Sequence, residues 1–247
     1  MDYKDKNVWI IGASSGIGEA LSHELAGRGA RLALSARRED KLALLATSLG
    51  QQHAAFALDV SDTQLFIDTA GSVRQHFGKI DHVIMLAATY TPSSIAALDP
   101  ADVRKIVDVN LIGSMNCLHA VLPHLRHQGS GQIALCGSVA AYRGLPRAQP
   151  YAATKAAVTN LAETAYIEEA RNGVDVRLIS PGFVRTPMTD KNTFHMPMMV
   201  SPDVAARAIA DGLLSSSFEI HFPKKFTYIM KLLRLLPNAL YLRMLRQ

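Results

Sequence analysis

An apolar run that ends in a glycine-rich turn lies close to the start of the chain. Val8-Trp-Ile-Ile11 leads into Gly12-Ala-Ser-Ser-Gly16-Ile-Gly18, and residues 19–28 have a helix-forming composition. Glycine lets backbone N–H groups approach a pyrophosphate, and the N-terminus of the next helix favours negative charge. The spacing differs from the usual Gly-x-Gly-x-x-Gly, but the order of strand, turn and helix favours dinucleotide binding. We predict phosphate contacts from Gly12, Ser14, Ser15, Gly16, Ile17 and Gly18.

Short apolar runs alternate with helical patterns along the rest of the chain, which is typical of a parallel sheet with helices on both faces. We expect strands at 7–11, 31–35, 53–58, 81–87, 131–137, 174–180 and 217–222. We expect helices at 16–28, 39–49, 62–77, 99–127, 150–172 and 202–213. The predicted fold class is therefore α/β, a doubly wound, Rossmann-type parallel sheet of about seven strands with a C-terminal amphipathic helical tail.

The length of the chain and its composition suit one domain. With 247 residues, of which 49% are hydrophobic, the chain is long enough to bury a large core. We expect residues 1–223 to form the dinucleotide-binding and catalytic part, and residues 224–247 to form a basic amphipathic tail of the same domain.

A tyrosine and a lysine stand four residues apart in Tyr151-Ala-Ala-Thr-Lys155, within an alanine-rich run. On a helix they share one face. An ammonium beside a phenol stabilises the phenolate, so we expect the pKa of Tyr151 to be lower than its ordinary value of about 10. A tyrosine tuned in this way exchanges a proton with a carbonyl or an alcohol. Alone the pair is common on helix surfaces, and its weight comes from the glycine-rich turn.

Further pieces accompany these two motifs. With them the chain resembles the short-chain dehydrogenases/reductases over roughly residues 7–220. The pieces follow that family's order: Gly12-Ala-Ser-Ser-Gly-Ile-Gly18, Asp59-Val60, Asn110, Ser138, Tyr151-x-x-x-Lys155 and Pro181-Gly-Phe-Val-Arg-Thr186.

The resemblance implies a set of roles. In that family the tyrosine exchanges the proton, the lysine holds the nicotinamide ribose, the serine positions the substrate oxygen and the asparagine supports a water-linked proton relay. By matching position these catalytic roles fall on Tyr151, Lys155, Ser138 and Asn110. The implied activity is hydride transfer between NADP(H) and a carbonyl or alcohol. The other implied cofactor contacts are Tyr151, Lys155, Val60, Ala87, Pro181, Gly182, Val184 and Thr186.

The end of the second predicted strand indicates which dinucleotide is bound. NAD-binding chains place a carboxylate there for the ribose 2′-hydroxyl, whereas NADP-binding chains use arginine for the 2′-phosphate. This chain has Arg37 and Arg38 and lacks the carboxylate. Guanidinium groups suit bidentate phosphate contacts, so we predict NADP(H), with Arg37 as the stronger candidate. Asp59 matches the family's adenine-side contact, and Val60 is expected to pack against the ring.

Two positions depart from the family pattern. Met85-Leu86-Ala87-Ala88 stands where the family often has Asn-Asn-Ala-Gly, and Ile11 stands where threonine usually precedes the first glycine. Because these strands are neighbours in the predicted sheet, we interpret the changes as apolar packing that replaces a polar contact. The alternative is a degraded cofactor site. Two other functions therefore stay open: a non-catalytic dinucleotide-binding or membrane-associated interaction protein, and an epimerase or dehydratase on the same fold.

Charge and cysteine usage exclude several function classes. Residues 224–247 carry six of the 26 basic side chains and no acidic one, so the rest of the chain is near neutrality, and we expect no nucleic-acid partner. Cys117 and Cys136 lie in apolar stretches without metal-ligand spacing, which predicts reduced thiols and no metal site. The first residues form no apolar leader, and no run of apolar residues looks long enough to span a bilayer, so we expect cytoplasmic residence.

Two apolar segments bear on substrate and partners. The run after Thr186 contains four methionines and Phe194, which indicates an apolar or lipid-like substrate, or simple gap filling. A helix at 226–236 is predicted to place Thr227, Lys231 and Arg234 on one narrow face and its apolar residues on the other. Such a tail suits either an anionic membrane surface or docking on the body or another subunit. We also expect a homo-oligomer formed through the helices at 99–127 and 150–172.

Overall fold

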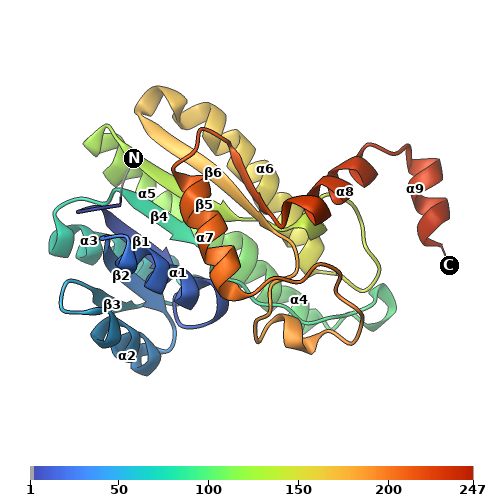
Figure 1. The fold of residues 1–247 in the computed structure, drawn as a ribbon, viewed down its shortest axis with the longest axis horizontal. Helices are drawn as coiled ribbons and strands as arrows, with labels where there is room; N and C mark the ends of the chain where they lie inside the picture. The colour runs from blue at the N-terminus through green and yellow to red at the C-terminus, as the bar shows by residue number, and fades with distance from the viewer. Residues whose placement is uncertain (1–2, 247) are drawn as a thin grey trace.

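Seven parallel strands form a single sheet in the computed structural model, which describes residues 3–246. The strand order is β3-β2-β1-β4-β5-β6-β7, and the sheet twists through the middle of the molecule (Figure 1). The predicted doubly wound α/β fold is thereby confirmed. The strands are β1 (Asn7–Ile11), β2 (Arg31–Ala36), β3 (Ala54–Ala57), β4 (His82–Met85), β5 (Gly131–Cys136), β6 (Val174–Pro181) and β7 (Glu219–Phe222).

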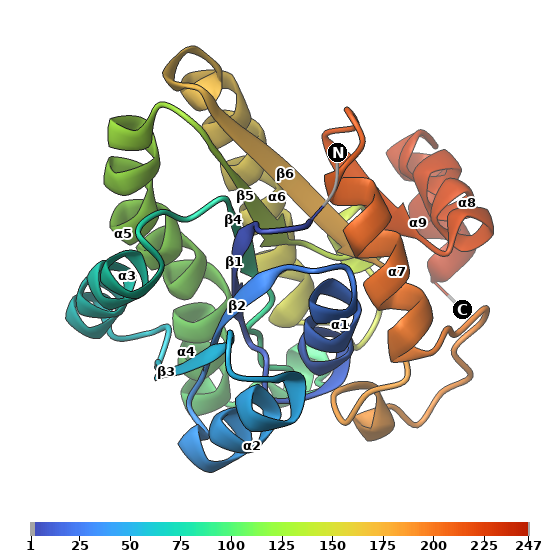
Figure 2. The same cartoon turned by 60° about the vertical axis from the view of Figure 1, so that its left-hand side comes forward.

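Helices cover both faces of the sheet (Figure 2). α1, α2 and α7 pack on one face, and α3, α5 and α6 pack on the other, as the two main core clusters show. The helices are α1 (Gly16–Gly27), α2 (Glu39–Leu49), α3 (Thr63–Phe77), α4 (Pro100–Val107), α5 (Gly113–Gln128), α6 (Tyr151–Glu169), α7 (Pro202–Leu213), α8 (Lys224–Arg234) and α9 (Asn238–Leu245).

The central strand β1 shows why the strand sequences are nearly continuous apolar runs without polar alternation. All five of its residues are buried. Trp9 and Ile11 belong to the cluster beneath α3, α5 and α6, whereas Val8 and Ile10 belong to the cluster beneath α1, α2 and α7. Successive side chains of a strand point to opposite faces, so a strand covered on both sides carries apolar residues on both faces. Asn7, at the start of β1, is the polar exception, and its side-chain amide donates to the carbonyls of Phe77 and Lys79.

The long helix predicted at 99–127 is in fact interrupted. α4 and α5 are joined by a π-helical segment, Asp108–Ile112, in which the N–H of Gly113 donates to the carbonyl of Asp108. Insertions of this kind shift the helical register and are frequent at functional sites. Asn110 lies inside this segment. The helix predicted at 150–172 likewise ends early, because residues 170–172 form a 3₁₀ turn.

The segment Pro100–Gln128 is long and apolar enough to cross a membrane by length and composition, so the expectation that no apolar run reaches this length was wrong. Half of its apolar window is buried inside the protein. Cys117, Val121 and Leu125 of α5 belong to the core cluster on the sheet. Its apolar character is therefore matched by contacts within the fold.

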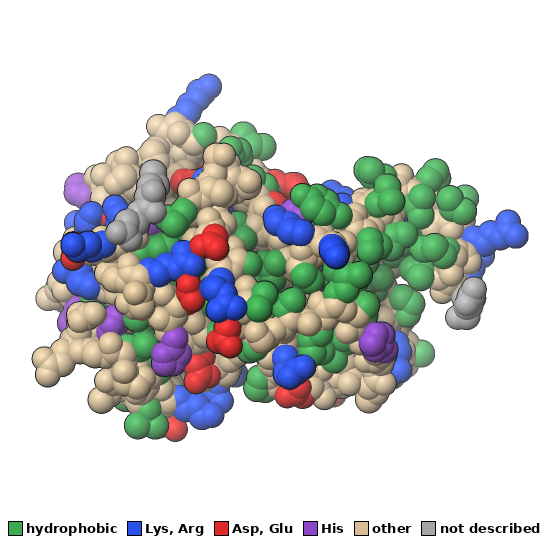
Figure 3. All heavy atoms as spheres, in the orientation of Figure 1, with side chains coloured by type: hydrophobic (Ala, Val, Ile, Leu, Met, Phe, Trp, Pro, Cys, Tyr) green, Lys and Arg blue, Asp and Glu red, His purple; other side chains and the backbone are tan. Residues whose placement is uncertain are grey.

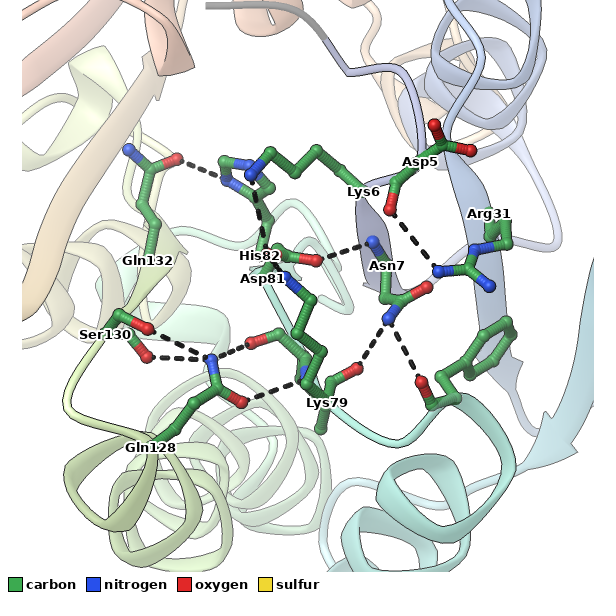
Figure 4. A network of polar contacts seen from close by, with 12 residues as sticks. Asp5, Lys6, Asn7, Arg31, Lys79, Asp81, His82, Gln128, Ser130 and Gln132 are labelled. Atoms are coloured by element: carbon green, nitrogen blue, oxygen red, sulfur yellow. Dashed lines mark hydrogen bonds and ion pairs between the residues drawn. The ribbon is translucent and has the colours of Figure 1, made fainter.

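A polar network holds the strand ends on the edge of the sheet opposite the glycine-rich turn (Figure 4). The N–H of Asn7 donates to Asp81 Oδ2 at 2.9 Å, and the N–H of Asp81 donates back to the Asn7 carbonyl at 2.9 Å. Lys79 pairs with Asp81 at 2.9 Å, and the ring of His82 hydrogen-bonds to Gln132 at 3.0 Å. These contacts tie the amino ends of β1, β4 and β5 together and serve the stability of the sheet.

The tail buries a different face from the one that the sequence pattern predicted. It contains two helices, α8 and α9, separated by Pro237. Thr227, which the sequence pattern placed with the basic residues on a polar face, is fully buried, and Ile229, which was placed on the apolar face, is half exposed. The reason is that Phe226 and Met230 pack on the body together with Val139, Tyr142 and Phe183, which turns Thr227 inward.

Candidate functional site

The carboxyl ends of β1 to β4 meet at one edge of the sheet, where a cavity of about 500 Å³ opens. The strand order reverses between β1 and β4, and ligands of open α/β sheets bind at this switch point. Most of the predicted cofactor contacts line the cavity: Gly12, Ser14, Ser15, Gly16, Ile17, Gly18, Arg37, Arg38, Asp59, Val60, Ala87 and Thr186.

Two glycines allow the turn after β1 to fold against β4 and α1. Gly12 has a φ of +99°, and a Cβ there would lie 2.6 Å from the backbone nitrogen of Ala87. A Cβ at Gly18 would lie 2.2 Å from the carbonyl oxygen of Gly12. Both contacts are too close for any side chain, so the path of the backbone along the cavity depends on glycine at these positions.

Arg37 and Arg38 lie at the rim of the cavity, where both are exposed. Arg38 donates to the carbonyl and hydroxyl oxygens of Ser14, at 3.1 and 2.9 Å, and so braces the glycine-rich turn. Asp59 accepts from the N–H and the hydroxyl of Ser61, at 3.0 and 2.6 Å. Burial raises the pKa of Asp59, but these hydrogen bonds and the charge of Arg37 lower it more, so the net shift is downward.

Several lining residues were missed by the sequence analysis. Ala36, Leu58, Leu86 and Cys136 end or directly follow β2, β3, β4 and β5, so nearness to the carboxyl end of a predicted strand was the available signal. Ile11, Ala88, Val109, Pro187 and Met188 also line the cavity. Five predicted contacts are not among its lining residues: Tyr151, Lys155, Pro181, Gly182 and Val184.

The residues after β6 are placed by the tail and by the following segment. The N–H of Gly182 donates to the Phe222 carbonyl at 2.7 Å, and a Cβ at this glycine would lie 2.8 Å from the ring of Phe226. Val184 is buried and forms a β-bridge with Val200. Pro181 is the last residue of β6.

Tyr151, Lys155 and Ser138 come together beside the cavity. Tyr151 begins α6, and Lys155 lies one turn later with only 2% of its surface exposed. The Lys155 ammonium donates to the carbonyl of Cys136 at 2.7 Å and stands 5.6 Å from the centre of the Tyr151 ring. Ser138 Oγ accepts from the N–H of Ala140 at 3.1 Å, which fixes the start of the 3₁₀ turn after β5.

The pKa of Tyr151 is shifted upward, opposite to the direction predicted from the sequence. Burial is the main cause, and the neighbouring Cys136 adds to it, whereas a hydrogen bond with Ser138 acts in the lowering direction. Burial also lowers the pKa of the Lys155 ammonium. Desolvation of the phenolate by burial thus acts against the lowering that was expected from the nearby ammonium.

Asn110 is fully buried and clamps the chain that follows β4. Its Oδ1 accepts from the N–H of Thr89 at 2.8 Å, and its Nδ2 donates to the Thr89 carbonyl at 3.0 Å. The same Nδ2 donates to Thr154 Oγ1 at 3.2 Å, and that hydroxyl donates to the carbonyl of Tyr151 at 2.7 Å. Asn110 thus links the loop after β4 to the first turn of α6.

Tyr90 is a residue of this site that the sequence analysis missed. Its ring packs edge-on against the ring of Tyr151, with centroids 5.1 Å apart. Its hydroxyl donates to Asn192 Oδ1 at 2.8 Å, and its carbonyl accepts from the Lys191 ammonium at 2.8 Å. Tyr90 therefore joins α6 to the methionine-rich segment. The available signal was its position just after a predicted strand end, where side chains of a parallel sheet meet the ligand.

The two departures from the family pattern lie side by side. Ile11 of β1 is in register with Met85 of β4, and both are fully buried in the same core cluster. The N–H of Leu86 donates to the carbonyl of Ile11 at 2.8 Å. The interpretation of coupled apolar packing therefore agrees with the geometry, and the strand pairing is intact at this point.

Comparison with known proteins agrees with the resemblance to the short-chain dehydrogenases/reductases. The family model described as short chain dehydrogenase matches residues 6–196. An uncharacterised oxidoreductase of Staphylococcus epidermidis is 37% identical over 214 residues, which cover 87% of this chain and 93% of that protein. An 11-beta-hydroxysteroid dehydrogenase-like 2 protein of Arabidopsis thaliana is 34% identical over 223 residues, covering 84% of this chain and 70% of that protein.

Solved structures agree on the fold. An alcohol dehydrogenase from the archaeon Thermococcus sibiricus, complexed with 5-hydroxy-NADP, superposes with a TM-score of 0.80 at 29% identity, covering 89% of this chain and 96% of that one. A 3-ketoacyl-(acyl-carrier-protein) reductase from Brucella melitensis, complexed with NADH, has a TM-score of 0.82 at 23% identity, covering 89% and 97%, and shows the fold alone. The chain is thus an oxidoreductase that belongs to the short-chain dehydrogenase family.

Proposed function

We propose that this oxidoreductase transfers a hydride between NADP(H) and the carbonyl or alcohol carbon of an apolar, lipid-like substrate. One observation carries the proposal: a glycine-lined cavity with two arginines at its rim lies directly beside Ser138, Tyr151 and Lys155. The same observation supports an intact site over a degraded one, because the glycine-lined backbone and the three side chains lie next to one another.

The residues present suit a dinucleotide with a 2′-phosphate. The glycine-rich turn and the start of α1 would hold the pyrophosphate, and Asp59 with Val60 would lie beside the adenine. Arg37 and Arg38 follow β2, where a NAD-binding chain places a carboxylate for the ribose. When bound, the dinucleotide supplies or accepts the hydride at its nicotinamide ring.

The chain's own residues handle the proton and the substrate oxygen. Tyr151 donates its phenolic proton to the oxygen of a carbonyl as that oxygen gains charge. Ser138 already accepts the N–H of Ala140, so its hydroxyl proton is directed to the substrate oxygen or to Tyr151. Lys155 stays in place through the Cys136 carbonyl and presents its charge to the same region. Asn110 holds the loop that places Tyr90 against Tyr151. We propose that it also supports a proton relay.

An apolar substrate is favoured by the segment that follows β6. Phe194 and Met198 are about half exposed, and the Phe194 ring packs against Phe183, with centroids 5.9 Å apart. Methionine and phenylalanine give an adaptable apolar surface. Two Arabidopsis relatives named 11-beta-hydroxysteroid dehydrogenase-like point in the same direction.

The cofactor choice is tested by titrating the protein with NADPH and with NADH. Arg37→Ala is expected to weaken NADPH binding at least about tenfold more than NADH binding, because only NADPH carries the 2′-phosphate. Arg207→Ala, an exposed arginine on α7, is the matched control and should change neither. Equal losses for the two cofactors would show that Arg37 does not contact the phosphate.

The chemistry is tested by a screen of NADPH oxidation with ketones, aldehydes and quinones of increasing hydrophobicity. Turnover that rises with hydrophobicity is the expected result. Binding of NADPH without turnover of any substrate class would favour a non-catalytic dinucleotide-binding protein, and substrate conversion without net cofactor oxidation would favour an epimerase or dehydratase.

We also propose that residues 1–223 carry the site and that residues 224–247 belong to the same domain. A homo-oligomer is supported by the outer surfaces of α5 and α6, where Met115, Tyr166 and Ile167 are exposed. Apolar side chains on two long helices suit close packing against a second copy. A single monomeric species in light scattering at micromolar concentration would refute this assembly.

A further inference from the structure

The inner face of the tail is already occupied by the protein itself. Phe226, Thr227 and Met230 of α8 and Tyr241 of α9 are buried. Phe226 and Met230 pack with Val139 and Tyr142, which follow Ser138 in the chain. These contacts leave the opposite side of both helices facing away from the body.

Polar contacts fix the tail in this orientation. The Lys231 ammonium pairs with Glu219 of β7 at 2.6 Å. Arg143 donates to the carbonyls of Arg234 and Leu236, at 3.2 and 3.1 Å, and to Asn238 Oδ1 at 2.9 Å. The Tyr241 hydroxyl donates to the carbonyl of Gly144 at 2.8 Å. Both helices are thus tied to the 139–145 segment, and their outer faces cannot turn inward without loss of these contacts.

The outer face is apolar. Leu235 is 79% exposed, Leu232 is 66% exposed and Tyr228 is 60% exposed. Hydrophobic side chains gather over the part of the molecule that holds α8 and α9, and basic side chains appear at its margins (Figure 3). We define the outer tail surface as the exposed apolar side chains of the two helices, which are Tyr228, Ile229, Leu232, Leu235, Leu240, Leu242 and Met244. Exposed apolar surface of this extent on a folded protein marks a contact with another apolar partner.

The charges of the tail identify that partner. Residues 224–247 include no acidic residue. Lys224 and Lys225 are exposed on the first turn of α8, at helical positions on the same side as Tyr228 and Leu232, and Arg243 is exposed on α9. We propose that the outer tail surface lies in the interface of a membrane that contains anionic lipid, with its apolar side chains at the acyl boundary and these cations among the headgroups.

A second copy of the chain fits this surface less well. A two-fold dimer through this surface would place the same patch on both partners. Lys224, Lys225 and Arg243 of both copies would then lie in one interface, with no acidic residue in either tail to balance their charges. Anionic headgroups supply the opposite charge that such a dimer lacks.

Docking in this orientation would bring the substrate side of the site toward the lipid. The ring of Phe183 contacts Phe194 of the methionine-rich segment on one side and Phe226 of α8 on the other, with centroids 5.9 and 5.4 Å apart. The methionine-rich segment, of which Pro187 and Met188 line the cavity, is therefore joined to α8. The docking itself does not depend on the proposed chemistry.

The test is flotation of the full-length protein with vesicles of phosphatidylcholine alone and of phosphatidylcholine mixed with phosphatidylglycerol. We expect binding to the mixed vesicles, weakened by salt. Lys224→Gln with Lys225→Gln should reduce the affinity about fivefold for each lysine. Leu232→Ser with Leu235→Ser should reduce it at least about tenfold, because two exposed leucines lose their contact with the acyl boundary.

The matched control is Leu44→Ser, since Leu44 of α2 is 72% exposed but lies outside the tail. Its vesicle binding should equal that of the wild type. All these side chains are exposed, so each variant should keep its melting temperature, which verifies folding. The proposal is overturned if the full-length protein does not float, if the leucine pair binds as the wild type does, or if that pair instead dissociates an oligomer in light scattering. NADPH binding is measured alongside, so failure of membrane docking and failure of the proposed chemistry are told apart.

Discussion

Replacement of Asn110 by alanine tests whether the buried amide holds the loop after β4. The change removes the acceptor for the N–H of Thr89 and the donors to the Thr89 carbonyl and to Thr154. The Thr154 hydroxyl keeps its hydrogen bond to the Tyr151 carbonyl. The backbone N–H and C=O of Thr89 are therefore the groups that lose their partner. Each such group costs about 1–3 kcal/mol when it is left unpaired. Thr89 is partly exposed, so water relieves part of this cost.

We expect Asn110→Ala to lower the free energy of unfolding by about 2–4 kcal/mol. For a chain of this size that corresponds to a fall in melting temperature of roughly 4–16 °C. Urea unfolding followed by circular dichroism measures the change without any substrate. Asn192→Ala is the control, because its hydrogen bonds lie in a surface segment where water replaces them, and it should cost under about 1 kcal/mol. A loss for Asn110→Ala as small as that of the control would refute the clamp.

Three further predictions concern the contact of β7 with the tail, the packing of α8 on the body and the ring beside Tyr151. Burial, together with two neighbouring lysines, lowers the pKa of His221 to about 4. The stability contributed by neutral His221 is therefore fully present above the ordinary histidine pKa of about 6.5 and should fall as the pH drops from there toward 4. In thermal melts, His221→Gln should flatten this dependence on pH. Phe226→Ala should cost about 3 kcal/mol in urea unfolding and lower kcat with NADPH affinity kept, because the cluster supports the segment after Ser138. Tyr90→Phe should raise KM about fivefold through loss of one hydrogen bond, and a double-mutant cycle with Asn192→Ala should show coupling, whereas additive effects would contradict the contact.

The fold was predictable because each element carries its own local signal. Apolar runs of strand length, helix starts and the glycine-rich turn are all short-range patterns. Within residues 3–246, the six helices predicted before the tail cover α1 to α7, and each of the seven strands was predicted. Asp62 and Ser201 are examples: each caps its helix through a backbone N–H three residues later. The π-helical segment around Asn110 was not predictable. Asn110 in this segment hydrogen-bonds to Thr89, 21 residues away, and side-chain periodicity does not encode such a contact.

The tail shows a limit of a different kind. α8 is apolar on more than one side. Phe226 and Met230 are buried, whereas Ile229 and Leu232, which are equally apolar, are exposed. Periodicity alone cannot choose between them. The choice depends on the aromatic rings of Phe183 and Tyr142, which the fold brings next to the tail from distant parts of the chain.

The candidate site likewise has one part that was predictable from local sequence and another part that depends on the whole fold. The residues of the glycine-rich turn lie next to one another in sequence, so their convergence on the cavity follows from local geometry. Lys155 instead finds its partner in the carbonyl of Cys136, and the pKa of Tyr151 responds to burial from several elements. Spacing in a sequence indicates which side chains meet, but the degree of desolvation that sets their protonation depends on the whole fold.

The most direct test of the proposed chemistry is the single-turnover rate of NADPH oxidation by Tyr151→Phe with the best carbonyl substrate from the screen. The change removes only the phenolic oxygen, so the fold and the affinity for NADPH should be kept. General acid catalysis by a placed side chain is worth about 10²–10⁴ in rate, and we predict a loss in this range. A rate within a few-fold of the wild type, with NADPH bound equally well, would contradict the assignment of Tyr151 as the proton donor.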